Sequence, residues 1–585
     1  MAKKKAVQLI RRWRFLLLLS LVLPLPFVLA HNIAQLQIIS GKAKGAEFLR
    51  RQGDSRHIRH HSIPAYRGLI LDRNGEPLAV STPVSFITAD PKVLVSKATP
   101  SQIKLLAHEL MISSSQLENR LEYYRNKHWM RFTNDPVTEE KAKNILALKI
   151  PGVSVENEYK RFYPAGEVTA NIVGMTNRKD KGIEGIELAY DAWLSGESGE
   201  RKVQIDNRQH VINHLSKIKE AKPGRDLHLG IDLRVQYAAY RSLKEAVYKN
   251  DAKSGSVVVL DALSGEVLAM ANQPSFNPND RVGLQFDPVR NRAMVDLIEP
   301  GSTVKPFTIL AALESGKFGV ASTIDTTPGW IKVENKIFDD PRDFGRLNLA
   351  EILVRSSQVG TTKIALQLNP YSTHALFQRV GLGESTGSGF PAEATGNLPA
   401  HVNWDPVTQA TFAFGYGLNV TALQLARAYS VIANNGNRRE VSLLRHDQPL
   451  EVTRVFDSEL VVTVRRMLSM ATGINGTGKR AVIEGYSVAG KTGTSHKISS
   501  IGGYDESRYT AVFAGLAPAV QPRLVTVVVI DEPDRGLHSG GQVAAPVFSD
   551  VMGNALRLLQ VKPDMLDGQF SLAKSIDYVE HGDDS

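Results

Sequence analysis

The sequence predicts an α+β protein, with an apolar anchor, an N-terminal module and a C-terminal domain whose helices pack on an antiparallel sheet. Three observations support this prediction. An apolar run follows a basic tail, a charged segment with a Pro-Gly pair interrupts the chain at residues 217–225, and hairpin patterns alternate with amphipathic helices beyond it. The 585 residues also exceed the roughly 100–200 residues of one domain.

The N-terminus has the pattern of a membrane anchor. A basic tail, residues 1–14, precedes a mostly apolar segment that we extend over residues 15–39. Positive charge before an apolar segment predicts that the tail stays in the cytoplasm and that the rest of the chain is exported. A cleaved signal peptide is the alternative, because Val28-Leu29-Ala30 fits a cleavage site.

Composition excludes several kinds of site. The chain has no cysteine, so disulfides, thiolate metal sites and a cysteine nucleophile are excluded. The formal net charge of +10 fits membrane topology and a solvated surface, and we expect no nucleic-acid binding. His57, His60 and His61 lie close together, but their spacing matches no metal-ligand pattern, so we predict a solvated linker and no metal.

The N-terminal module covers residues 40–222 and shows no recognisable chemistry. Asn74-Gly75 predicts a tight turn after a strand, and apolar spacing over residues 100–150 predicts helices. The C-terminal domain covers residues 223–566, and a polar tail at 567–585 is predicted to be disordered. The expected elements of the C-terminal domain are helices at 233–248, 421–434 and 544–559, a hairpin at 256–260 and 266–270, and a strand at 525–530.

A candidate nucleophile, Ser302, lies in the segment of residues 299–306. Gly301 breaks the preceding segment and an apolar run follows, so Ser302 is expected to open a helix. Lys305 lies about one turn further on the same face, and an amine that has lost its proton could activate the hydroxyl. Pro306 predicts an irregular first turn. Taken alone, the pair fits a helix-capping serine with a solvated lysine better than a catalytic pair.

Two further polar segments follow. At residues 356–358, Ser-Ser-Gln places a carboxamide two positions after a hydroxyl, an arrangement also common in loops. At residues 491–494, Lys-Thr-Gly-Thr offers an amine and hydroxyls to an anionic group. Residues 485–492 also fit the P-loop pattern. A P-loop needs a helix directly after its lysine, and no helical periodicity follows, so an ATPase is not predicted.

In this order, the three segments resemble the signature set of penicillin-binding proteins and serine β-lactamases. Residues 67–79, 161–166 and 182–187 also resemble the N-terminal module of class B penicillin-binding proteins. The short basic tail and Leu423-Gln424-Leu425-Ala426-Arg427 make the pattern most similar to the division-type FtsI family. The resemblance implies an elongated pedestal domain followed by a penicillin-binding transpeptidase domain.

The resemblance further implies a peptidoglycan D,D-transpeptidase that cross-links stem peptides during septal cell-wall synthesis. Ser302 would attack the carbonyl between two D-alanines, with Lys305 as its base and Ser356 as a proton relay. β-Lactams would acylate the same serine. A hydrolase of the carboxypeptidase or β-lactamase type, or a non-catalytic β-lactam sensor or scaffold of the division complex, is the alternative.

The family also implies how the substrate is held. Lys491 and Thr492, with Thr494 beyond Gly493, would bind the terminal carboxylate. Backbone amides of Ser302 and Thr494 would form the oxyanion hole. No cofactor is implied.

Two positions set this chain apart. The family has asparagine at the position of Gln358, whose carboxamide reaches one methylene further. This puts the typical rate and β-lactam profile in doubt and allows a specialised paralogue. His496 follows the Lys-Thr-Gly element, so we hypothesise that activity or β-lactam affinity changes between about pH 5 and 7 through it. A solvated histidine at a strand end is the alternative.

Partners and location follow from the same resemblance. The protein would span the inner membrane once, with its N-terminus inside and its catalytic domain in the periplasm. It would contact peptidoglycan stem peptides, an FtsW-type lipid-II polymerase and other division proteins.

Overall fold

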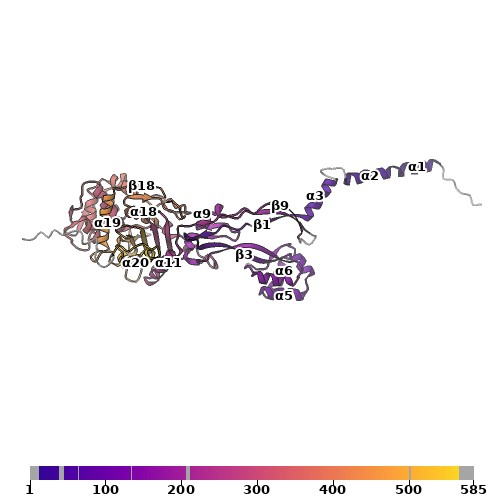
Figure 1. Cartoon of the computed structure of the whole chain (residues 1–585), viewed down its shortest axis with the longest axis horizontal. Coiled ribbons are helices and arrows are strands. Elements are labelled where there is room, and N and C mark those ends of the chain that lie inside the picture. Colours follow the sequence, from indigo (N-terminus) through magenta and orange to yellow (C-terminus); the bar gives the residue numbers. More distant parts are fainter. Residues whose placement is uncertain are drawn as a thin grey trace, which may run out of the picture. The chain divides into compact units, whose positions relative to one another are not determined.

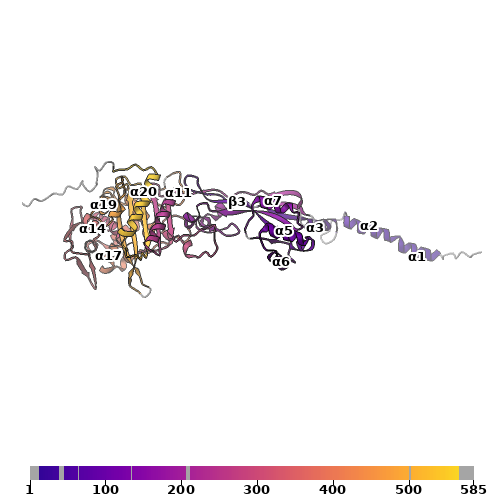
Figure 2. The same ribbon diagram turned by 90° about the horizontal axis from the view of Figure 1, so that it is seen from below.

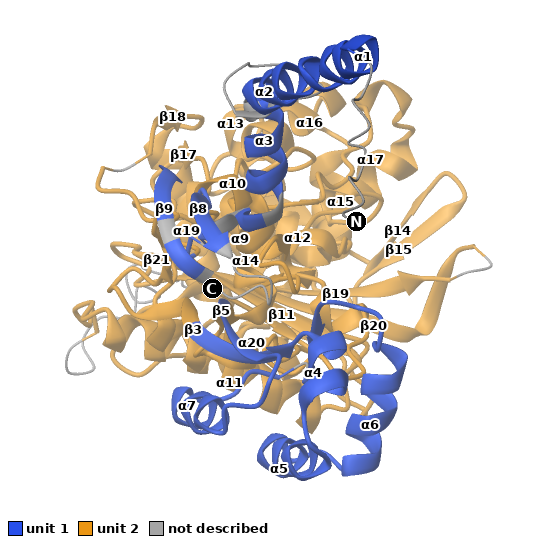
Figure 3. Cartoon of the chain, turned by 90° about the vertical axis from the view of Figure 1, so that its right-hand side faces the viewer, with its two compact units in different colours: residues 1–66, 83–159, 196–223 blue, residues 67–82, 160–195, 224–585 orange. Residues whose placement is uncertain are grey.

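The computed structural model describes residues 12–37, 45–63, 65–133, 135–205, 211–448, 450–499 and 502–565. They form two compact units, coloured in Figure 3. Unit 1 comprises residues 1–66, 83–159 and 196–223, and unit 2 comprises residues 67–82, 160–195 and 224–585. The predicted tail at 567–585 and most of the basic tail at 1–14 lie outside the described residues.

Unit 1 begins with the apolar segment. Helices α1 (Arg12–Val22) and α2 (Pro24–Gln37) carry a stretch, Arg12–Gln35, that is long and apolar enough to cross a membrane. The stretch has no buried residues, so its apolar side chains have no protein core to cover them. It coincides with the predicted anchor, and it fits a single-pass anchor or a signal sequence by length and composition.

The remainder of unit 1 has a small sheet and a helical cluster. Strands β1 (Ile58–Ile63), β8 (Gly199–Ile205) and β9 (Val211–Lys219) pair antiparallel. Helices α5 (Pro100–Leu110), α6 (Ser114–Tyr123) and α7 (Glu139–Ala147) begin at threonine or serine caps. Their apolar faces share one core, which includes Leu106, Leu117 and Ile145. The helices predicted over residues 100–150 are therefore confirmed.

Unit 2 is built on a five-stranded antiparallel sheet with the order β12-β11-β21-β20-β19. These strands are β11 (Ser254–Asp261), β12 (Val267–Gln273), β19 (Ala489–Ile498), β20 (Tyr504–Ala517) and β21 (Leu524–Asp531). The predicted hairpin corresponds to β11 and β12, and the predicted apolar strand corresponds to β21. β19 lies at the edge of the sheet, so among the described residues one side of its backbone has no strand partner.

Helices cover both faces of this sheet. Helices α11 (Leu233–Lys249) and α20 (Gly540–Leu558) lie side by side on one face, as Figures 1 and 2 show. On the other face, α13 (Lys305–Glu314), α18 (Ala422–Ala433) and α19 (Ser458–Ala471) contribute to the larger core. The α+β prediction is confirmed, and the three predicted helices correspond to α11, α18 and α20.

A buried ion-pair network joins two segments of unit 2 that the sequence places in the N-terminal module. The Arg67 guanidinium lies 2.6 Å from Glu187 Oε2 and 2.6 Å from Asp191 Oδ1. Arg161 Nε lies 2.7 Å from Glu187 Oε1. These pairs link residues 67–82 to residues 160–195 within the larger unit. The boundary predicted at residue 223 stays a prediction.

Candidate active site

Ser302 lies in a short 3-10 helix, η3 (Gly301–Val304), and α13 begins directly after it at Lys305. The amide of Lys305 donates to the Ser302 carbonyl, so the two residues belong to one tight turn. Ser302 is partly exposed, whereas the Lys305 side chain is 1% exposed. The helix start and its irregular first turn are as predicted, and Lys305 is a buried amine, not a solvated one.

Ser356 forms hydrogen bonds with the lysines of the other two motifs. It ends α14 (Leu349–Arg355) in the left-handed region, with a φ of 59°. Lys305 Nζ donates to the Ser356 carbonyl at 2.5 Å and to its hydroxyl at 3.3 Å. Lys491 Nζ donates to the same hydroxyl at 2.9 Å. One hydroxyl therefore connects two lysines that come from different elements.

Lys491 to Thr494 lie on the edge strand β19, which excludes the P-loop alternative because no helix follows Lys491. The strand passes closely beside the Ser302 turn. A Cβ atom at Gly493 would lie 2.7 Å from the carbonyl oxygen of Pro300, so a side chain at this position would push the two segments apart. The absence of a side chain at Gly493 thus allows β19 to lie against the turn that carries Ser302.

The threonine hydroxyls of this strand have fixed partners. Thr492 Oγ1 donates to Thr477 Oγ1 at 2.9 Å. Thr494 Oγ1 accepts the amide of Gly540, the first residue of α20, at 3.1 Å. Because Thr494 uses its oxygen as the acceptor, its own proton remains available for an anion.

Asp340 supports the second motif, and sequence reasoning missed it. Its carboxylate accepts the Ser357 hydroxyl and the Gln358 amide, each at 2.5 Å. The interaction caps α15 (Gln358–Ala365) and holds the turn that carries Ser356. Only the backbone of Gln358 takes part, and among the described residues no hydrogen bond is formed by its carboxamide. A buried aspartate 18 residues before Gln358 belongs to no short motif.

Burial determines the charge of both lysines. Desolvation lowers the pKa of Lys305 to about 7, although the nearby Asp340 carboxylate acts in the opposite direction. Desolvation also holds the pKa of Lys491 well below its ordinary value, and proximity to Lys305 lowers it further. With a pKa of about 7, Lys305 is partly neutral near physiological pH and can accept a proton in that form.

A second polar cluster borders the Ser302 turn, and sequence reasoning missed the contact between its Glu299 and Tyr504. Glu299 Oε1 accepts the Gly417 amide at 2.8 Å and the Tyr504 hydroxyl at 3.1 Å. Desolvation is the main cause that raises the pKa of Glu299. The His496 ring packs on Tyr509 with centroids 4.7 Å apart, and within the described chain its Nδ1 is buried without a partner.

Comparisons with known proteins agree with this geometry. A family model described as the penicillin binding protein transpeptidase domain matches residues 255–553, and one for the penicillin-binding protein dimerisation domain matches residues 62–229. The chain is 40% identical to the peptidoglycan D,D-transpeptidase FtsI of Escherichia coli K12 over 557 residues, which cover 95% of this chain and 93% of FtsI.

Other relatives extend the match. The chain is 40% identical over 572 residues to the probable peptidoglycan D,D-transpeptidase PbpC of Pseudomonas aeruginosa, which covers 98% of this chain and 99% of PbpC. Penicillin-binding protein 3 of Mycobacterium tuberculosis in complex with aztreonam superposes with a TM-score of 0.67 at 27% identity, over 86% of this chain and 98% of that one. The chain belongs to the class B penicillin-binding proteins of the FtsI, PenA and PbpC type.

Proposed function

We propose that the protein is a serine-type peptidoglycan D,D-transpeptidase that forms cross-links during septal wall synthesis. The observation that carries the proposal is the convergence of the Lys305 and Lys491 amines on the hydroxyl of Ser356, with Lys305 in the same tight turn as Ser302. Its close relatives are named for the same activity.

The first half-reaction forms an acyl-enzyme. Ser302 Oγ attacks the carbonyl between the two D-alanines of a donor stem, and neutral Lys305 accepts the hydroxyl proton. The tetrahedral oxyanion binds to the backbone amides of Ser302 and Thr494. Collapse breaks the peptide bond, and Ser356 relays a proton to the departing D-alanine amine.

The second half-reaction transfers the acyl group. The amine of a neighbouring stem attacks the ester, loses its proton through the same groups and releases Ser302. A new peptide bond thereby replaces the one that was broken. Splitting the transfer in this way replaces one difficult step by two easier ones.

The donor carboxylate is held by Lys491, Thr492 and Thr494. Lys491 is buried, and desolvation lowers its pKa, whereas a neighbouring carboxylate favours the protonated form that can bind it. Gly493 allows the close approach that places this strand beside the nucleophile. Gln358 directs its carboxamide to the donor.

The cellular setting follows from the anchor and the family. The apolar N-terminal stretch spans the inner membrane, the basic tail stays in the cytoplasm and the catalytic domain works in the periplasm. Residues 40–222 act as a pedestal, residues 223–566 as the transpeptidase domain, and an FtsW-type lipid-II polymerase and other division proteins are the partners.

Labelling of the full-length protein with a fluorescent penicillin tests the function. We expect a stable adduct that survives denaturation and is lost in Ser302→Ala. Ser315→Ala, which changes a serine at the other end of α13, is the matched control and should label normally. Absence of an adduct would favour the scaffold alternative, and rapid release of the label would favour the hydrolase.

A further inference from the structure

A cavity of about 610 Å³ lies beside the segment that leads to Ser302, and no step of the proposed reaction uses it. It is lined by one end of the sheet, by α12 (Arg292–Val295) with the residues before it, and by residues 296–299. All of these residues belong to unit 2.

The floor of the cavity is the end of a sheet face that elsewhere forms the apolar core. Along β11, the core residues Val258 and Leu260 alternate in phase with Ser254 and Ser256. β20 and β21 make the same change on this face, where core residues give way to Thr510 and Asp531. The polar side chains of the floor are Ser254, Ser256, Ser495, Lys497, Thr510 and Asp531. A change shared by three neighbouring strands indicates a polar site rather than a gap in the core.

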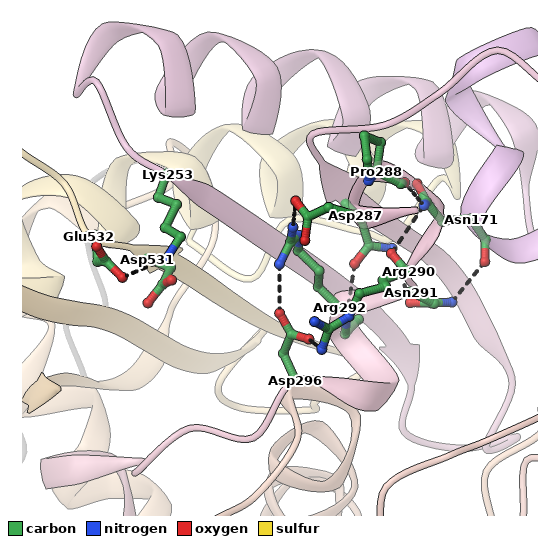
Figure 4. Close-up of polar contacts among 12 residues, drawn as sticks. Asn171, Lys253, Asp287, Pro288, Arg290, Asn291, Arg292, Asp296, Asp531 and Glu532 are labelled. Carbon is green, nitrogen blue, oxygen red and sulfur yellow. Dashed lines mark hydrogen bonds and ion pairs between the residues drawn. The ribbon is translucent and has the colours of Figure 1, made fainter. Parts of the chain in front are cut away.

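The opposite wall carries two arginines, shown in Figure 4. Arg290 pairs with Asp296, and Arg292 bridges Asp296 at 2.9 Å and Asp287 at 2.6 Å. Arg292 is 9% exposed, and within the described chain its Nε has no hydrogen-bond partner. Asp287 and Asp296 anchor the terminal nitrogens of Arg292, so Arg290, whose side chain is 51% exposed, offers the accessible guanidinium of this wall to a carboxylate.

Buried asparagines fix this wall in place. Asn171 Nδ2 donates to the carbonyls of Pro288 at 2.7 Å and Arg290 at 3.1 Å (Figure 4). Asn291 Nδ2 donates to the carbonyl of Asn171 at 3.1 Å. The backbone that presents the arginines is therefore held before any ligand arrives, which reduces the entropy cost of binding.

The charges of the lining cancel. Lys497 lies 2.8 Å from Asp531 on the floor, facing the arginine wall. The four basic side chains are Lys253, Arg290, Arg292 and Lys497, and the four acidic ones are Asp287, Asp296, Glu299 and Asp531, which gives a formal charge of zero. Such a lining disfavours an apolar ligand, because its binding would remove water from the charged side chains. It also disfavours a ligand with a net charge, because that charge would be left uncompensated in the cavity.

We propose that this cavity binds a zwitterionic amino acid or short peptide. The carboxylate contacts the Arg290 and Arg292 wall, and the ammonium contacts Asp531 on the floor. Ile298 and Glu299 line the same cavity, so occupancy shifts the segment that holds Ser302 and alters its acylation rate. This last step rests on the proposed function, in which stem peptides and released amino acids belong to this class of ligand.

Calorimetric titration with L-alanyl-L-alanine tests the binding. The full-length protein in detergent is first acylated with benzylpenicillin, so that the catalytic site is filled. We expect saturable binding, and at least about tenfold weaker binding of the N-acetylated and the C-amidated dipeptides, the loss expected for one hydrogen-bonded charge. No binding, or equal binding of the capped dipeptides, would overturn the proposal. If benzylpenicillin does not acylate the protein, the proposed function fails, while the titration still reports on the cavity.

Variants locate the binding site. Arg290→Gln and Asp531→Asn should each weaken the dipeptide at least about tenfold. Arg379→Gln removes an ion pair with Glu314 elsewhere in unit 2 and should bind like wild type. Wild-type affinity in both cavity variants, or equal loss in the control, would overturn the assignment. Acylation of unblocked protein by fluorescent penicillin should change at saturating dipeptide in wild type but not in Arg290→Gln, and an unchanged wild-type rate would overturn the coupling to Ser302.

Discussion

Replacing Asp340 by asparagine removes a buried negative charge without changing the size of the side chain. The carboxylate accepts the Ser357 hydroxyl and the Gln358 amide, each at 2.5 Å, and the Val359 amide at 3.3 Å. An asparagine keeps one acceptor oxygen, so at least one of these donors loses its partner. A hydrogen bond to a charged group contributes about 1.5–3 kcal/mol, and the charge at the start of α15 about 0.3–1 kcal/mol. We therefore expect Asp340→Asn to lower the free energy of unfolding by about 2–4 kcal/mol.

The same substitution should change the pH dependence of acylation. The Asp340 carboxylate raises the pKa of Lys305 against the larger effect of burial, which brings it to about 7. Without this charge the pKa falls further, and Lys305 stays neutral at lower pH. Because only the neutral amine accepts the Ser302 proton, the acid limb of the rate profile should move to lower pH.

Urea unfolding measures the first effect, and fluorescent-penicillin acylation from about pH 5 to about pH 9 measures the second. Asp339→Asn is the matched control, since this neighbouring aspartate is exposed. A loss of stability no greater than in the control would refute the capping role. If the acid limb of the acylation rate profile stays in place or moves to higher pH, the proposed effect of the Asp340 charge on Lys305 is refuted.

Four further outcomes are expected. Wild-type acylation should fall to half its maximum near pH 7, where Lys305 gains its proton, and a flat profile would exclude this lysine as the base. In urea unfolding, Glu187→Ala should cost about 3–5 kcal/mol because it leaves two buried arginines without their shared carboxylate, whereas exposed Glu184→Ala should cost less than about 0.5 kcal/mol. Gln358→Asn should leave urea stability within about 0.5 kcal/mol, because among the described residues only the backbone of Gln358 is hydrogen-bonded. It should also raise β-lactam acylation rates, and an unchanged rate for every β-lactam would contradict a role of side-chain length. His496→Ala tests the hypothesis drawn from the sequence, and acylation profiles identical to wild type would end it.

Much of unit 2 could be predicted because its signals are local. The apolar run of β21 and the amphipathic spacing of α11 lie within single segments, and both elements formed where expected. Ser302 and Lys305 are one turn apart, so their proximity follows from helix geometry alone. The family pattern then added Ser356 and Lys491, whose hydrogen bond in the structure spans 135 residues.

Other features depend on residues that no short pattern joins. Asp340 lies in a connection between two other strands and supports the turn of Ser356. Arg67 forms an ion pair with Glu187, which is 120 residues further along the chain. The neutral cavity beside Ser302 combines strand ends with α12, and each contributor alone resembles an ordinary surface position.

Local periodicity thus suffices for the fold class and the apolar N-terminal segment, because helix and strand geometry act over a few residues. The candidate nucleophile also needed the order of the three motifs, which is read from the family resemblance. The tertiary structure alone reveals that Lys305 is buried and near its neutral form, that Asp340 holds the second motif, and that a polar cavity lies beside the nucleophile's segment. Burial and electrostatic interactions depend on distances in space, and only the packed chain determines those distances.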